Sequence, residues 1–124
     1  MSLVFGYASG RTPGSRSGMR VFDDGLVERL SAGGGWRRIA TMTPQEVEDL
    51  AERTRAAGIA DLPPEVPRTD TMRDGNDCEL WTELDGRSVR SVIRGWDEVN
   101  PAARPSLELV LAMSSLVSAA QARS

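Results

Sequence analysis

The sequence contains no histidine and no lysine, so all 15 of its basic residues are arginine. Histidine is the commonest general base and the commonest metal ligand near neutral pH. Lysine forms Schiff bases and holds phosphates in nucleotide-binding loops. Without these two residue types few routes to catalysis are open, and the composition favours binding over chemistry.

Cysteine and long hydrophobic runs are also scarce. The single cysteine, Cys78, excludes an internal disulfide, and we interpret it as a small buried strand residue, since a nucleophile would need a histidine partner. The longest apolar stretch, residues 107–120, is interrupted by Glu108 and three serines and is too short and too polar to span a bilayer. Residues 1–6 lack the features of a signal peptide, so we expect a cytoplasmic protein with no membrane partner.

The charge balance limits the class of partner. The net charge of −3 argues against nucleic acid, because nucleic-acid-binding proteins usually carry a clear basic excess. A chain of 124 residues, of which 40% are hydrophobic, is expected to form one domain over residues 1–124. Aromatic residues make up 5% of the chain, so we expect a core of mainly Leu, Val, Ile and Ala.

Two antiparallel strand pairs are predicted around Asp-Gly turns, and the first covers residues 19–30. A three-residue loop with a left-handed Gly25 would pair Arg20 with Glu28 and Val21 with Val27. A two-residue turn would instead place Arg20 opposite another arginine, and like charges in that position are destabilising. We therefore predict the register that pairs Arg20 with Glu28.

The second strand pair is predicted to turn at Asp85-Gly86 and to have one apolar face. The other face carries Glu79, Trp81 and Arg90, with Trp81 directly opposite Arg90 and able to form a cation–π contact. A slip of one residue would mix the two faces, so this register should be well specified. The predicted pairs are Leu84 with Arg87, Thr82 with Val89, Leu80 with Ser91 and Cys78 with Ile93.

Two helices complete the expected fold. Thr43 and Glu46 have the spacing of a capping box, and Gly58 supplies the left-handed cap at the other end of the first helix. The second helix should open at Pro105 or Ser106, and it is apolar around most of its circumference. That pattern predicts either burial on two sides or a homodimer contact through residues 106–120.

The expected fold class is therefore α+β. Residues 2–8 would form a first strand and residues 36–40 a short edge strand. Together with the two Asp-Gly hairpins they predict an antiparallel sheet of four or five strands, with the two α-helices packed on one face.

An acidic group precedes the strand that begins at residue 77, and it consists of Asp70, Asp74, Asp77 and Glu79. Carboxylate oxygens suit a hard cation such as calcium, but the spacing lacks the loop pattern that makes such a site specific. Arg68 precedes these acids and Arg73 lies between two of them, so we interpret the segment as a salt-bridged loop. No metal or cofactor is expected.

Loop 9–18 joins two predicted strands and carries Arg11 and Arg16. Loops held at both ends by a rigid sheet concentrate binding residues. Trp36 and Trp96 also lie in predicted loops or edges, and Trp and Arg are the residue types most enriched in binding hot spots. These four residues form a candidate partner-binding surface; the alternative for Trp36 and Trp96 is that each caps the core at an end of the sheet.

A resemblance to a known family follows from the order of several segments. Tyr7-Ala-Ser-Gly10 leads into a Ser-Gly loop, Thr-Pro-Gln-Glu-Val-Glu-Asp-Leu50 opens a helix, Ala-Gly-Ile-Ala-Asp-Leu-Pro63 follows it, and a leucine-rich helix ends the chain. This order resembles that of emfourin-type small bacterial domains, which inhibit thermolysin-like metalloproteases. Loop 9–18 departs from the family because it lacks a Gly-Gly-Phe character. The resemblance implies inhibition of a bacterial protease, and it transfers no contact residue to this chain.

We therefore predict a non-enzymatic domain that binds another protein, with inhibition as one form of that binding. Arg11 and Arg16 would meet acidic groups of the partner, and Trp36 or Trp96 would supply apolar anchors.

Two alternatives stay open. One is a small-molecule-binding or accessory enzyme domain of a biosynthetic pathway, with a pocket between sheet and helices at Asp77, Glu79, Trp81 and Arg90. In that case Asp77, Glu79 and Arg90 would carry any acid–base work, and a cavity with a buried carboxylate of raised pKa would favour this alternative. The other is a homodimeric structural module.

Overall fold

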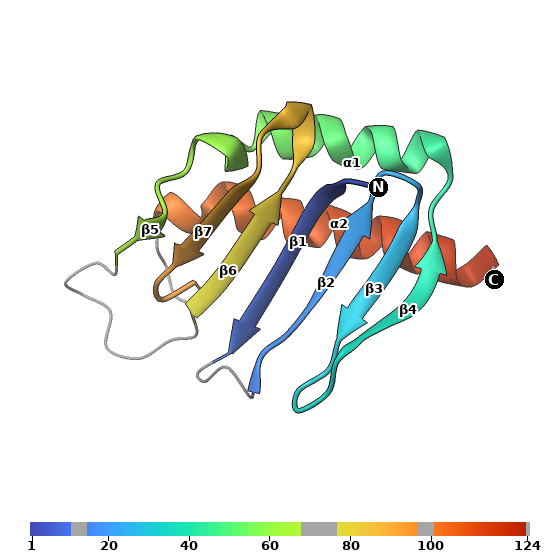
Figure 1. The fold of residues 1–124 in the computed structure, drawn as a ribbon, viewed down its shortest axis with the longest axis horizontal. Coiled ribbons are helices and arrows are strands. Elements are labelled where there is room, and N and C mark those ends of the chain that lie inside the picture. Colours follow the sequence, from blue (N-terminus) through green and yellow to red (C-terminus); the bar gives the residue numbers. More distant parts are fainter. Residues whose placement is uncertain (11–14, 68–76, 97–100, 124) are drawn as a thin grey trace.

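The chain folds into two layers, a seven-stranded sheet and a pair of helices (Figure 1). The computed structural model describes residues 1–10, 15–67, 77–96 and 101–123. The strands are β1 (Leu3–Gly10), β2 (Ser17–Phe22), β3 (Leu26–Leu30), β4 (Trp36–Thr41), β5 (Glu65–Val66), β6 (Asp77–Thr82) and β7 (Val89–Ile93). The helices are α1 (Pro44–Ala56) and α2 (Arg104–Arg123).

The prediction of four or five antiparallel strands is wrong in number and in orientation. The strand order is β4-β3-β2-β1-β6-β7-β5, and β5 runs parallel to β7. β5 has two residues, too few to show an alternating pattern, and it lies in a proline-rich segment that resembles a loop. Proline is tolerated there because an edge strand need not donate every backbone N–H. The carbonyls of Pro64 and Val66 accept hydrogen bonds from the N–H groups of Val92 and Arg94, at 2.9 Å each.

The predicted pairings within both strand pairs are confirmed, except at the second turn. There Leu84–Gly86 form a short 3₁₀ helix and β6 ends at Thr82, so the predicted pair of Leu84 with Arg87 is not part of the sheet. Arg20 lies opposite Glu28, and Val21 lies opposite Val27. In the second pair Cys78 lies opposite Ile93, Leu80 opposite Ser91 and Thr82 opposite Val89. Cross-strand charge and the alternation of apolar residues were therefore sufficient to specify these pairings.

The first helix begins where its capping box predicts. The backbone N–H of Glu46 donates to Oγ1 of Thr43 at 3.2 Å, and the N–H of Thr43 donates to Oε1 of Glu46 at 2.9 Å. Gly58, with φ of 71°, follows the helix in the left-handed conformation. Arg123 near the end of α2 donates from Nη1 to Glu46 at 3.1 Å, so the same carboxylate also links the two helices.

Replacing Thr43 with alanine is expected to lower the free energy of unfolding by about 1 kcal/mol, because one amide of the first turn loses its acceptor. Urea denaturation measures the loss. Gln45→Ala is the matched control, since Gln45 is exposed in the same turn and alanine suits a helix. Equal stability of the Thr43→Ala variant and the wild type would contradict the role of the cap.

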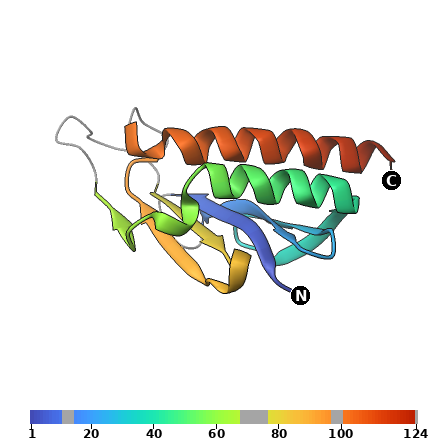
Figure 2. The ribbon, with the colours of Figure 1, turned by 90° about the horizontal axis from the view of Figure 1, so that it is seen from above.

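The core lies between the sheet and the helices. Its fully buried side chains include Phe5 of β1, Leu50 of α1, Leu80 of β6 and Met113 of α2. Figure 2, which shows the molecule from above, places both helices on one side of the sheet; no described element covers the other side. We call that uncovered side the open face. None of the helices in the described ranges is long and apolar enough to cross a membrane.

Candidate functional site

The centre of the open face carries very small residues. Gly6 and Ala8 of β1 share this face with Gly18 of β2, which lies opposite Ala8. A Cβ atom at Gly18 would lie 1.8 Å from the backbone oxygen of Tyr7, so the two strands approach too closely there for a side chain. The consequence is a depression of about 490 Å³ in the open face. It is lined by Leu3, Ala8, Arg16, Arg20, Leu30, Trp36, Glu79 and Trp81.

Two tryptophans meet above this bare centre. Trp36 comes from β4 and Trp81 from β6, and three strands separate them in the sheet. Their ring centroids are nevertheless 6.2 Å apart, with the rings inclined at 72° in an edge-to-face arrangement. A Cβ atom at Gly6 would lie 3.2 Å from the Trp81 ring, so a glycine leaves room for the indole to lie across β1. Arg20 of β2 places its guanidinium carbon 4.1 Å from the Trp36 ring centroid, a cation–π contact.

A buried carboxylate ties the side of the depression together. Glu79 is 7% exposed. Its Oε2 accepts a hydrogen bond from Nη1 of Arg16 at 2.8 Å, and its Oε1 accepts from Nε1 of Trp81 at 3.1 Å. Oε1 also accepts from Nε of Arg90. The carboxylate therefore fixes the positions of two arginines and one tryptophan.

The electrostatics of Glu79 favour its charged form. Burial is the largest single influence and raises the pKa, but the hydrogen bond and charge of Arg90, the Trp81 N–H and the charge of Arg16 together outweigh it. The pKa of the Glu79 carboxyl is therefore below its ordinary value. An ionised carboxylate whose two oxygens are both engaged is suited to positioning its neighbours, and a general base would need a freer and more basic oxygen.

The predicted pocket between the sheet and the helices is not where Glu79, Trp81 and Arg90 lie. These residues share the open face, whereas the adjacent Cys78 and Leu80 point into the core and are fully buried. Arg90 ion-pairs with Glu79, and the Trp81 ring meets Trp36, so the predicted Trp81–Arg90 cation–π contact is replaced by these interactions.

Asp77, the remaining member of that predicted pocket, lies at one end of β6. It binds Arg94 at 2.7 Å and accepts a hydrogen bond from the backbone N–H of Gly95 at 3.3 Å. Arg94 also contacts Glu65 of β5 at 3.0 Å, so Asp77 belongs to a set of contacts that holds the β5 edge.

The structure describes two of the three residues predicted for the loop and edge of the partner-binding surface, Arg16 and Trp36. Arg11 lies outside the described residues. Arg16 does not project from a loop tip, because its side chain is 21% exposed and bound to Glu79. Trp36 is half-buried at the wall of the depression. The structure thus brings Arg16 and Trp36 together with Glu79 and Trp81, residues that the sequence assigned to two separate sites.

Trp96 lies in the core. It is 9% exposed, and its ring stacks on Tyr7 with the centroids 6.0 Å apart. Its indole N–H donates to Oγ of Ser106 at 3.3 Å, which satisfies the polar atom inside the protein. Trp96 therefore caps the core, as the alternative had it, and is not an accessible anchor.

The acidic segment before β6 is described only in part, since Asp70 and Asp74 lie outside the described residues, as do Arg68 and Arg73. Over the described ranges, no group of three or more acidic or cysteine side chains converges on a metal position.

Cys78 is fully buried, as interpreted from the sequence, and burial raises the pKa of its thiol well above the ordinary value. A raised pKa keeps the thiol protonated and unreactive.

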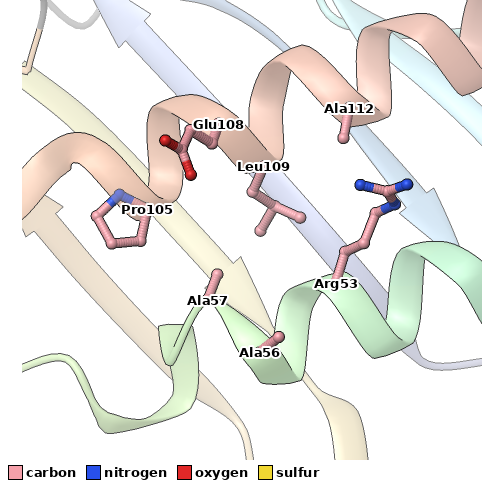
Figure 3. A pocket seen from close by; sticks show the side chains of 7 residues that line it. All are labelled: Arg53, Ala56, Ala57, Pro105, Glu108, Leu109 and Ala112. Atoms are coloured by element: carbon pink, nitrogen blue, oxygen red, sulfur yellow. The ribbon is translucent and has the colours of Figure 1, made fainter.

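A second hollow, of about 380 Å³, lies on the opposite side of the molecule between α1 and α2 (Figure 3). It is lined by Arg53, Ala56, Ala57, Pro105, Glu108, Leu109 and Ala112. Alanines form much of its wall, and Arg53 is already paired with Asp49 at 3.0 Å. The large exposed apolar residue of α2 is Leu111, whose exposed fraction is 69%. The homodimer contact through residues 106–120 stays a prediction.

Sequence reasoning missed two parts of the open-face site. One is Arg20, because its spacing from Glu28 indicates a strand register and carries no sign of a contact with tryptophan. The other is the bare centre, although its signal is present as the alternation of small residues at Gly6, Ala8 and Gly10. Glycine and alanine at every second position leave one face of a strand with no side chain larger than a methyl group.

A scan against models of protein families finds no match for this chain, and no curated protein matches it. The function therefore has to follow from the geometry of the open face.

Proposed function

We propose that this chain is a non-enzymatic protein-binding domain whose partner docks on the open face of the sheet. One observation carries the proposal: Trp36 and Trp81 meet over a bare sheet centre with Arg20 stacked on Trp36, on a face that no described element covers. Trp and Arg clustered near the centre of a surface are the typical composition of a binding hot spot.

The rigidity of the cluster supports this role. Arg20 is paired with Glu28 at 2.7 Å, and Trp81 donates its indole N–H to the buried Glu79. Side chains that are held in place before binding lose less conformational entropy when a partner arrives.

Inhibition of a bacterial thermolysin-like protease is the specific form of this function that we propose, and its support is the resemblance in the order of sequence segments. A direct assay is available. The purified domain should reduce peptide hydrolysis by a thermolysin-like metalloprotease, and the Trp36→Ala variant should reduce it less. No inhibition at micromolar domain would remove the inhibitor role while leaving protein binding to be tested separately.

The test of protein binding is affinity capture from a lysate of the source organism with three baits. These are the wild type, a Trp36→Ala/Trp81→Ala double variant, and Leu111→Ser as the matched control. Leu111 is an exposed residue of α2, and α2 lies on the side of the sheet away from the open face. Circular dichroism first establishes that all three baits are folded.

A partner of the open face is expected to be enriched by the wild type and by Leu111→Ser, and lost with the double variant. Removing a hot-spot tryptophan costs about 2 kcal/mol or more, which is roughly a thirtyfold loss of affinity. Retention by the double variant would place the partner elsewhere, and loss with Leu111→Ser alone would favour the outer face of α2.

A small-molecule-binding role is the second candidate, because the depression of about 490 Å³ falls within the range of ligand pockets. This depression differs from the pocket expected from the sequence in two ways. It lies on the open face and not between the sheet and the helices, and the pKa of its carboxylate, Glu79, is lowered and not raised. Thermal-shift screening of the wild type against Trp81→Ala tests this candidate: a ligand that stabilises only the wild type supports it.

A further inference from the structure

Positive charge exceeds negative charge around the depression. Of the residues that line the depression, Arg16 and Arg20 carry positive charges and Glu79 carries a negative one. Their ion-pair partners outside the lining, Arg90 and Glu28, add one charge of each sign. Each glutamate is ion-paired within this group, so the surplus is one positive charge. The surplus is local, because the whole chain has a net charge of −3.

The guanidinium groups have further donors to offer. A guanidinium carries five N–H donors. Arg90 reaches Glu79 through Nε, and its side chain is 67% exposed. Arg20 reaches Glu28 through Nε and Nη2 while its plane lies over Trp36. Arg16 reaches Glu79 through Nη1, and its buried Nε has no hydrogen-bond partner among the described residues. That Nε atom is itself buried, so the guanidinium that an incoming acceptor can reach most readily is the exposed one of Arg90.

We infer that the depression receives an Asp or Glu side chain of the protein partner, with a neighbouring apolar or aromatic group of the partner packed against Trp36 and Trp81. This inference rests on the proposed function and names the chemistry that the open face recognises. A carboxylate matches the planar fork of donors on arginine and carries the single negative charge that balances the surplus. A nucleic acid carries a run of charges and would need a far larger basic excess.

Phenylacetate is the probe, because it joins one carboxylate to one aromatic ring, and phenylacetamide is its neutral counterpart of almost the same shape. The readout is the set of three indole N–H signals in a ¹⁵N-correlated NMR spectrum, one from each tryptophan. Trp36 and Trp81 line the depression, whereas Trp96 is in the core and serves as the internal reference.

At millimolar concentration phenylacetate is expected to shift the Trp36 and Trp81 signals and to leave the Trp96 signal in place. It should bind about tenfold more tightly than phenylacetamide, since charge-assisted hydrogen bonds are about twice as strong as neutral ones. Arg90→Gln is expected to reduce this preference. Its side chain is exposed, so the variant should stay folded, and the Trp96 signal verifies this.

Equal binding of the two probes, or an unchanged preference in Arg90→Gln, would overturn the carboxylate assignment. If the partner is still lost with the Trp36→Ala/Trp81→Ala variant, the proposed function survives that result. Micromolar binding of phenylacetate together with partner capture that does not depend on the tryptophans would instead make the depression a small-molecule site and overturn both.

Discussion

Replacing Glu79 with glutamine is expected to lower the free energy of unfolding by about 2–3 kcal/mol. The change keeps the volume of the side chain but removes the charge that faces Arg16 and Arg90. Arg16 is mostly buried, so it would be left as an uncompensated charge with little access to water. The amide N–H₂ of glutamine would also oppose the donors of Arg16, Trp81 or Arg90 where an oxygen now accepts from them.

Denaturation by urea measures this loss, and Arg90→Gln is the matched control. Arg90 is exposed, and removing it leaves Glu79 paired with Arg16 and bonded to Trp81, so we expect a much smaller effect. Comparable losses in the two variants would show that the Glu79–Arg90 contact, and not the buried Glu79–Arg16 pair, carries the energy of the network.

The Glu79→Gln substitution also changes how the free energy of unfolding depends on pH. The pKa of Glu79 is lowered in the folded protein, so folding favours the ionised form. That contribution is fully present above the ordinary glutamate pKa of about 4.3 and is lost as the pH falls through the folded value. The Glu79→Gln variant should therefore lose less stability than the wild type between neutral and strongly acidic pH. The stability of the variant should still fall with pH, but less steeply than that of the wild type, because Arg123 and Thr43 also lower the pKa of Glu46.

Replacing Gly18 with alanine is expected to lower the free energy of unfolding by about 2–3 kcal/mol, at the upper end of the range for overpacking. The added Cβ atom would lie 1.8 Å from the backbone oxygen of Tyr7 and 2.8 Å from Cα of Ala8. These are backbone atoms, so they cannot rotate away as a flexible side chain would. β1 and β2 would have to separate locally, with weakening of the hydrogen bonds between them.

Gly35→Ala is the control for this prediction. A Cβ atom at Gly35 would have no atom within 4 Å, and Gly35 lies in an exposed turn. Its stability should change by less than about 0.5 kcal/mol. Thermal unfolding of both variants measures the difference, and a Gly18→Ala protein as stable as the wild type would contradict the close approach of the two strands.

Much of the fold could be predicted because its determinants are local. The capping box joins residues three positions apart, and the register of β2 and β3 follows from whether Arg20 meets Glu28 or another arginine. The pairing of β6 with β7 follows from the alternation of apolar residues on either side of one turn. β5 could not be predicted, because two residues are too few to show the alternation of apolar and polar side chains. Its pairing with β7 also depends on contacts between segments far apart in the chain.

The candidate site could be predicted only in part, for the same reason. The sequence by itself determined the residue types: no histidine or lysine, 15 arginines, three tryptophans, and small residues at every second position from Gly6 to Gly10. Only the tertiary structure decided which of them meet. Glu79 and Arg16 are 63 residues apart in the chain, and Trp36 meets Trp81 across three strands. Such contacts depend on the order of strands in the sheet and on the missing side chains at Gly6 and Gly18. Local patterns do not contain that order, because it results from how the whole chain buries its core.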